Sequence, residues 1–532
     1  THTAVAQLPA TAMIGPRGTD AAGLSLAASS TFFASAGVAV VAPAGDRDSE
    51  LVAASVAIGL GVPSLLSGRQ ATVQALRAEL DRLGVRTVLT VGEVANLDAS
   101  EPEAAQPSES ASSLDSSTAQ FDVIPLPAGV SSILGREFGA GDPVPEDGQV
   151  AALGDLDPAA PQVLRLAGAA EPPTTPSAPP LPDGAVLAET TRLDGIVVLS
   201  DGTPDQVAAV GTARAAGAAV VVVPGGDPRS SSEAISALAS ADPTSVVGLG
   251  GSFGSGEDVQ WRSAAAATGV ELPGGTQLVF GGKRYAALYG TPGSGALGVL
   301  GEQDVPATLA RAREHAEALQ PYTEDLMVPS LEIIASIASA GEGPDGDYSN
   351  TRPVSELRPL VEAAREADLY VVLDLQPGRT DFLTQAKLYE ELLLLPHVGL
   401  ALDPEWRLLP HQRHLRQIGS VGIDEVNGVV DYLANLVREN RLPQKLLVLH
   451  QFSLSMIRER ARLDTSRSEL AVMIHADGQG TQPAKAGTWN TLRAGAPEVY
   501  WGWKNFYDED IPMLDPEQTM NIVPTPHLVS YQ

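Results

Sequence analysis

The chain has 532 residues, a formal net charge of −31 and no cysteine. Its length suggests several domains, since a domain usually holds about 100–200 residues, and its 44% hydrophobic content is enough to bury large cores. The negative charge argues against nucleic acid as a partner, because a phosphate backbone would be repelled. The lack of thiols excludes disulfides and thiolate metal sites.

No apolar run reaches the roughly 20 residues that a membrane span needs, so no transmembrane segment is expected. The chain begins Thr1-His2-Thr3 without an initiator methionine, which indicates that a leader was removed. We therefore expect an extracellular protein of the cell wall or cell surface. Attachment through a lipid on a residue before Thr1 stays open.

Residues 1–98 are predicted to form a first α/β module. Apolar runs at 38–43, 61–66 and 85–92 predict strands, and helical spacing at 46–59 and 71–83 predicts the helices between them. Strands that alternate with helices indicate a parallel sheet.

Residues 99–190 are predicted to be a low-complexity insert and a linker. The stretch 99–121 is dense in Ser, Glu, Ala, Pro and Gln, and it cannot bury enough apolar surface to offset its ordering entropy. We expect a mobile loop there and a semi-rigid Pro-rich spacer at 168–183. The part between them is expected to add irregular structure to the first module.

The same pattern recurs at 191–272 and predicts a second α/β module. The matching strands lie at 195–202, 218–224 and 245–251, and the matching helices lie at 206–217 and 232–241. A recurring unit of this kind predicts duplicated modules.

These two regions resemble the type 2 cell-wall-binding repeat of Gram-positive surface proteins. The resemblance rests on a strand followed by an Ala-rich helix, on Gly61-Val-Pro-Ser-Leu-Leu66 and on Val-Leu-Thr-Val-Gly at 88–92. The second copy lacks the Pro-x-Leu-Leu signature, and two copies are visible where the family usually has three. The resemblance implies non-covalent contact with wall polymers. The alternative is a generic α/β domain that supports the second half.

Residues 278–532 are predicted to form a (β/α)8 barrel. Continuous apolar runs suit strands that are covered on both faces, and eight β/α units fit about 250 residues. The predicted strands are 285–289, 327–332, 369–374, 398–403, 446–450, 470–475, 499–503 and 528–531. The predicted helices are 305–319, 354–366, 380–394, 424–440, 452–462 and 487–494. A doubly wound open sheet is the rival, but it gives no reason for polar residues at nearly every strand end.

Polar residues follow most of these strands, and in such barrels the carboxyl ends of the strands hold the catalytic groups. Glu405 is the expected proton donor, because Trp406 and the barrel wall would raise its pKa by desolvation. Its partner is expected to be Asp403, Glu332 or Asp374. The predicted substrate-binding residues are Tyr289, Gln376, Trp406, His450, Gln451, His475, Asp477, Trp503 and Lys504.

The second half also resembles barrel glycoside hydrolases in layout, and glycoside hydrolysis needs two nearby carboxyl groups. The resemblance implies a cell-wall polysaccharide or oligosaccharide as the partner. No cofactor or metal ligand is predicted for this function. Two alternatives stay open: a non-catalytic glycan-binding protein, and a metal-dependent hydrolase that uses His450, His475, Asp374, Asp403 and Asp477.

Overall fold

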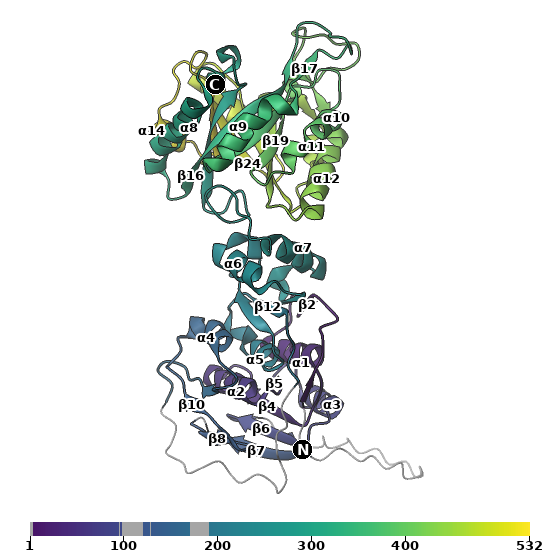
Figure 1. The fold of residues 1–532 in the computed structure, drawn as a ribbon, viewed down its shortest axis with the longest axis vertical. Coiled ribbons are helices and arrows are strands. Elements are labelled where there is room, and N and C mark those ends of the chain that lie inside the picture. The colour runs from purple at the N-terminus through teal and green to yellow at the C-terminus, as the bar shows by residue number, and fades with distance from the viewer. Residues whose placement is uncertain (1–3, 95, 98–120, 128, 171–190) are drawn as a thin grey trace, which may run out of the picture. The chain divides into compact units, whose positions relative to one another are not determined.

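Figure 1 shows the fold in a computed structural model, which describes residues 4–94, 96–97, 121–127, 129–170 and 191–532. The chain divides into two compact units, Thr1–Ala267 and Thr268–Gln532. Apart from their edges, the predicted loop at 99–121 and the predicted spacer at 168–183 lie outside the described residues. In the parts of the chain that are described, no helix is long and apolar enough to cross a membrane.

The first unit contains two four-stranded parallel sheets. One joins, in spatial order, β5 (Ser64–Ser67), β4 (Val38–Pro43), β6 (Thr87–Val91) and β7 (Asp122–Leu126). The other joins β13 (Ala219–Val222), β12 (Ile196–Ser200), β14 (Ser245–Leu249) and β2 (Met13–Ile14). The predicted α/β class is therefore confirmed, and the strands expected in each module are present.

Short strands and helices complete this unit. The short strands are β1 (Ala4–Ala6), β3 (Phe33–Ala36), β8 (Ser132–Ile133), β9 (Arg136–Glu137), β10 (Gly139–Ala140) and β11 (Gln162–Val163). The helices are α1 (Ala21–Phe32), α2 (Arg47–Leu60), α3 (Val73–Leu83), α4 (Gln149–Asp155), α5 (Val207–Ala215), α6 (Ser232–Ala241) and α7 (Gly256–Ala266). The segment expected to add irregular structure thus contributes β7 and α4.

Helices α2 and α5 pack closely because both carry small residues at the crossing. A Cβ atom added to Gly211 would lie 2.7 Å from the Cβ of Ala54. The hydroxyl of Thr212 donates to the carbonyl of Ser64 and accepts from its N–H, both at 3.0 Å. These contacts join the two sheets of the first unit around one buried core.

The second unit is a closed barrel of eight parallel strands, as predicted. The strands are β15 (Lys283–Gly290), β16 (Leu326–Ala338), β18 (Tyr370–Leu375), β19 (Val398–Leu402), β21 (Lys445–Gln451), β23 (Leu470–Ala476), β24 (Tyr500–Asn505) and β25 (Leu528–Tyr531). The barrel closes because β15 pairs with both β16 and β25. Three short strands lie outside the ring: β17 (Ser349–Thr351), β20 (Val421–Gly422) and β22 (Ile457–Arg458).

Helices cover the outside of the barrel (Figure 1). They are α8 (Val305–Leu319), α9 (Val354–Glu366), α10 (Phe382–Leu388), α11 (Glu390–Leu393), α12 (Ile423–Glu439), α13 (Gln482–Arg493) and α14 (Pro516–Met520). The helix predicted at 452–462 is wrong, since β22 lies there between two short 3-10 turns. Glu459 has a positive φ of 57°, which breaks the helix, and the buried Arg460 side chain bonds to Gln451 and Leu492 instead.

Side chains along each barrel strand alternate between the interior and the helix layer. Near the amino ends of the strands the interior is apolar, with Tyr285, Val328, Tyr370 and Met473 packed together. Nearer the carboxyl ends the inward positions become polar. The carboxyl and imidazole groups of Glu332, Asp374, His450 and His475 therefore gather at one end of the barrel.

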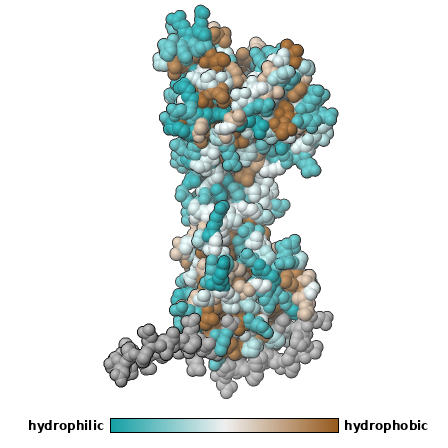
Figure 2. Space-filling view, turned by 180° about the vertical axis from the view of Figure 1, so that it is seen from behind, coloured by the Kyte–Doolittle hydropathy of each residue, from teal (hydrophilic) through white to brown (hydrophobic). Residues whose placement is uncertain are grey.

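On the face shown in Figure 2, hydrophilic residues are widespread and apolar residues form small separate patches. The three most exposed apolar side chains of the second unit, Leu415, Ile511 and Val523, lie on loops.

Candidate active site

The polar end of the barrel interior is built from successive strands. Tyr289, Glu332, Asp374, His450 and His475 all occupy inward positions near the carboxyl ends of their strands, and all are at most 3% exposed. The sequence predicted this convergence, because the carboxyl ends of parallel strands meet at one mouth.

His450 is the centre of a hydrogen-bonded chain. Its Nε2 lies 2.5 Å from Glu332 Oε1, and its Nδ1 lies 3.0 Å from Asp477 Oδ2. Burial lowers the pKa of His450, but the carboxylates of Glu332 and Asp477 outweigh burial and raise it well above the ordinary value. The two carboxylates thus fix the orientation of the imidazole ring.

The pKa values of the surrounding carboxyl groups are pushed apart. Burial raises the pKa of Glu332 and of Asp477, but in each case His450 outweighs it and the pKa is lowered. Burial raises the pKa of Asp374 to about 7 against the attraction of His450. Such a separation lets neighbouring carboxyl groups act as acid and base at one pH.

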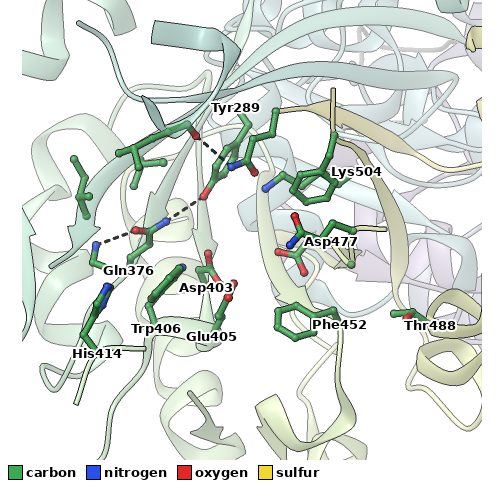
Figure 3. A pocket seen from close by; sticks show the side chains of 18 residues that line it. Tyr289, Gln376, Asp403, Glu405, Trp406, His414, Phe452, Asp477, Thr488 and Lys504 are labelled. Atoms are coloured by element: carbon green, nitrogen blue, oxygen red, sulfur yellow. Dashed lines mark hydrogen bonds between the residues drawn. The ribbon is translucent and has the colours of Figure 1, made fainter. Parts of the chain in front are cut away.

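Tyr289 connects this cluster to its neighbours. Its hydroxyl donates to Asp374 Oδ2 at 2.9 Å and accepts from Gln376 Nε2 at 3.2 Å. The Lys504 ammonium lies 3.5 Å from the centroid of the Tyr289 ring, where the π face attracts a cation. In Figure 3, Tyr289 lies between Gln376 on the left and Lys504 on the right.

A cavity of about 600 Å³ opens at the carboxyl ends of the strands. Its volume falls in the range of small-ligand sites. The lining includes Tyr289, Gln376, Asp403, Glu405, Trp406, His414, Phe452, Asp477, Thr488, Lys504 and Phe506. In Figure 3, Glu405 lies between the rings of Trp406 and Phe452.

Asp403 and Glu405 stand where β19 ends. Glu405 belongs to a 3-10 turn, Pro404–Trp406, that immediately follows Asp403. Burial, and then the charge of Asp477, raise the pKa of Glu405 to about 7. Burial, and then the charge of Asp374, raise the pKa of Asp403 well above its usual range. The sequence indicated the direction of the Glu405 shift.

Several buried polar atoms at this end of the barrel have no hydrogen-bond partner. They are Glu332 Oε2, Asp374 Oδ1, Asp403 Oδ1, Asp477 Oδ1 and His475 Nδ1. A buried polar atom without a partner costs about 1–3 kcal/mol, so such an atom calls for an explanation, such as a catalytic role or a bound water, ion or ligand. Their concentration at one place makes this end of the barrel the candidate site.

Four of the predicted substrate-binding residues do not line the cavity, and one of them is the fully buried His450 described above. Gln451 faces the helix layer and accepts a hydrogen bond from Arg460. Trp503 packs edge-on against Trp489 in the same layer. His475 faces inward below the cavity, where its Nε2 lies 2.7 Å from Ser530 Oγ.

Strand alternation could have placed two of these residues correctly. Gln451 follows the inward His450, and Trp503 precedes the inward Lys504, so each has to face outward. Conversely, Phe452 lines the cavity and was missed, although it lies two positions after His450. His414 was missed because it lies in a loop, and it stacks on Trp406 with the ring centroids 5.2 Å apart.

Glu332, Asp374 and His450 could also hold a metal ion. One ligand atom from each lies within 4.8 Å of the others. Of the ligands that the sequence suggested for a metal-dependent hydrolase, His450 and Asp374 are in this group, whereas His475 bonds to Ser530. Asp477 contacts the group through His450.

Fold and site together define a (β/α)8-barrel protein with a carboxylate-rich cavity at the carboxyl ends of its strands. No protein-family model matches the sequence, and no curated protein shows a significant match to it. The chemistry of the cavity is therefore the basis on which a function can be proposed.

Proposed function

We propose that the barrel binds and hydrolyses a cell-wall polysaccharide or oligosaccharide, with Glu405 as the proton donor. One observation carries the proposal: a half-buried glutamic acid lines an open cavity together with two aromatic residues and other carboxyl groups. Aromatic faces are suited to sugar rings, and paired carboxyl groups are the usual catalysts of glycoside hydrolysis.

The pKa of Glu405, about 7, supports its role as the general acid. Near neutral pH it is therefore protonated in a large share of the molecules, and it can give its proton to the leaving glycosidic oxygen. It also faces the cavity, where a substrate can reach it.

The partner of Glu405 must be an ionised carboxylate that reaches the same cavity. Asp477 fits best, because its Oδ2 accepts from His450 while its Oδ1 has no partner and it lines the cavity. Asp403 fits less well, since its raised pKa favours the neutral form. Glu332 and Asp374 are completely buried and do not line the cavity. Asp477 is thus proposed as the base or nucleophile.

The cavity also offers groups for holding a sugar. Trp406 and Phe452 provide apolar faces, although one face of Trp406 is taken by His414. Gln376 and Lys504 provide polar groups that can bond to hydroxyl groups. A few polar groups placed among aromatic walls are the usual composition of a specific ligand site.

The test is the substitution Glu405→Gln, which keeps the shape of the side chain and removes the acid. We expect kcat for the release of reducing ends from purified Gram-positive cell-wall polysaccharide to fall by about 10²–10⁴-fold, with KM nearly unchanged. The matched control is Glu509→Gln, an exposed glutamate on the loop after β24 that does not line the cavity.

The outcomes separate the proposal from its non-catalytic alternative. Full turnover in the Glu405→Gln protein would remove Glu405 from the role. Glycan binding by the unaltered protein with no release of reducing ends would instead support a binding protein without catalysis.

A metal-dependent hydrolase is the second candidate, and the proximity of Glu332, Asp374 and His450 favours it. Such an enzyme would lose activity in a chelator and regain it when Zn²⁺ or Mn²⁺ is added. In that case Glu405→Gln would leave much of the turnover intact.

We further propose that the first unit carries duplicated modules that contact wall polymers, and that the protein acts outside the cell, at the wall or surface. Two facts support the duplication. Three consecutive strands are arranged in the same order in both sheets, with the first strand between the second and the third. The sequence resemblance to the cell-wall-binding repeat covers both sheets.

A further inference from the structure

We propose that Glu332, Asp374 and His450 form a binding site for a divalent cation below the floor of the cavity, with Asp477 positioning His450. This proposal goes beyond glycan hydrolysis. It concerns a ligand whose binding can be measured without any substrate, so it stands or falls separately from the role of Glu405.

The three side chains come from different strands and meet inside the barrel. His450 Nε2 lies 2.5 Å from Glu332 Oε1 and 3.9 Å from Asp374 Oδ1. Ligand atoms that each lie about 2.0–2.2 Å from one cation are themselves at most about 4.4 Å apart. A cation therefore needs only a small widening of the contact between His450 and Glu332.

Asp477 supplies the contact that metal-bound histidines usually have. Its Oδ2 lies 3.0 Å from His450 Nδ1, on the side of the ring opposite to Glu332. A histidine that binds a metal commonly gives its other N–H to a carboxylate, which fixes the tautomer and the direction of the ring. When a cation replaces the proton that His450 Nε2 shares with Glu332, Nδ1–H stays bonded to Asp477 and the Nε2 lone pair points to the cation.

Unpartnered atoms provide the independent indication of a ligand. Glu332 Oε2 and Asp374 Oδ1 have no hydrogen-bond partner, and both residues are fully buried. Asp403 Oδ1 and Asp477 Oδ1 lack partners as well, and these two residues line the cavity above. Oxygen atoms placed in this way can bind a cation directly or through a water molecule on the cavity side.

The charge of the cluster favours a cation. Glu332, Asp374, Asp403 and Asp477 bring four carboxyl groups into a buried region beside His450. A divalent cation held by Glu332 and Asp374, with His450 as a neutral ligand, offsets the charges of these two buried carboxylates.

The donor set indicates which ions fit. Two carboxylates and one imidazole suit Zn²⁺ or Mn²⁺, and the chain has no cysteine to favour a softer ion. Mg²⁺ fits less well, because it prefers oxygen ligands and keeps several waters.

The experiment measures thermal unfolding of the full chain after treatment with a chelator. With ZnCl₂ or MnCl₂ at about 100 times Kd, we expect the Tm of the barrel to rise by about 5–10 °C, because the cation binds only the folded state. Titration calorimetry with MnCl₂ should show one tight site for each chain. Absence of a Tm shift with both ions would overturn the proposal.

Variants of the proposed ligands test where the cation binds. Asp374→Asn should abolish the shift, and Asp477→Asn should weaken cation affinity by about 10–100-fold. Glu405 lines the cavity but is not a proposed ligand, so the Glu405→Gln variant should keep the full Tm shift. A shift that survives in Asp374→Asn would overturn the proposed site. If that variant does not fold by circular dichroism, Glu332→Gln serves in its place, and the calorimetric stoichiometry of the unaltered chain still decides.

Discussion

Asp403 and Glu405 show how one turn gives two carboxyl groups different surroundings. Asp403 immediately follows β19 and is 3% exposed, whereas Glu405 lies two residues later and is half-buried. Desolvation raises both pKa values, and that of Glu405 is about 7, so Glu405 can exchange a proton near neutral pH. The sequence predicted that Asp403 and Glu405 belong to the site. It did not show that Asp477 contacts His450, and the role proposed for Asp477 depends on that contact.

Two tryptophans at the barrel end are predicted to differ in their roles. Trp406→Ala should raise KM by up to about tenfold, since the ring faces the cavity, and should change stability little. Trp503→Ala should lower the free energy of unfolding by about 3–5 kcal/mol with KM unchanged, because Trp503 packs between the barrel and α13. Denaturant titration and steady-state kinetics check both. A raised KM in the Trp503 variant alone would reverse the two roles.

At the level of elements, the sequence predicted the eight strands of the barrel and the helices α8 and α9 closely. Buried strands and amphipathic helices are determined by their own hydrophobic patterns, which a single sequence displays. The segment 452–462 was mispredicted because its conformation depends on distant partners. The Arg460 guanidinium reaches Gln451 and the carbonyl of Leu492, and local pattern does not reveal such contacts.

Lys445, the first residue of β21, gives a prediction for the stability of this strand. It is fully buried, its ammonium donates to the carbonyls of Leu395 and Val398, and burial lowers its pKa to about 7. Above pH 7 the unfolded state therefore holds one proton more than the folded state. The free energy of unfolding should rise with pH by up to about 1.4 kcal/mol per unit between about pH 7 and 10.

The substitution Lys445→Met removes this titration, so its stability should lack that part of the pH dependence. Denaturant titrations of the two proteins at several pH values provide the measurement. The same slope in both proteins would show that Lys445 is not the group responsible.

At the level of the whole molecule, the chain consists of two units that each bury cores of their own. The sequence separated these regions by composition and by the change from one repeated pattern to another. It could not show that the N-terminal β2 adds to the second sheet of the first unit, because that pairing joins segments far apart in the chain.

This division predicts that each unit folds alone. Residues 268–532 should keep the glycan chemistry, and residues 1–267 should co-sediment with purified Gram-positive cell walls. Circular dichroism and sedimentation of the two fragments check this, with the barrel fragment as the control for non-specific wall binding. A folded fragment 1–267 that stays in the supernatant would contradict the wall-binding proposal.

The pH dependence of glycan hydrolysis tests the central role of Glu405 most directly. Burial and the charges of Asp477, Lys504, His450 and Asp374 together leave the pKa of Glu405 at about 7. The measurement is the rate of reducing-end release from cell-wall polysaccharide by the intact chain between about pH 5 and 9. Because the protonated form is the acid, the rate should fall about tenfold per unit above about pH 7. A rate that stays constant or rises across that range would contradict the account.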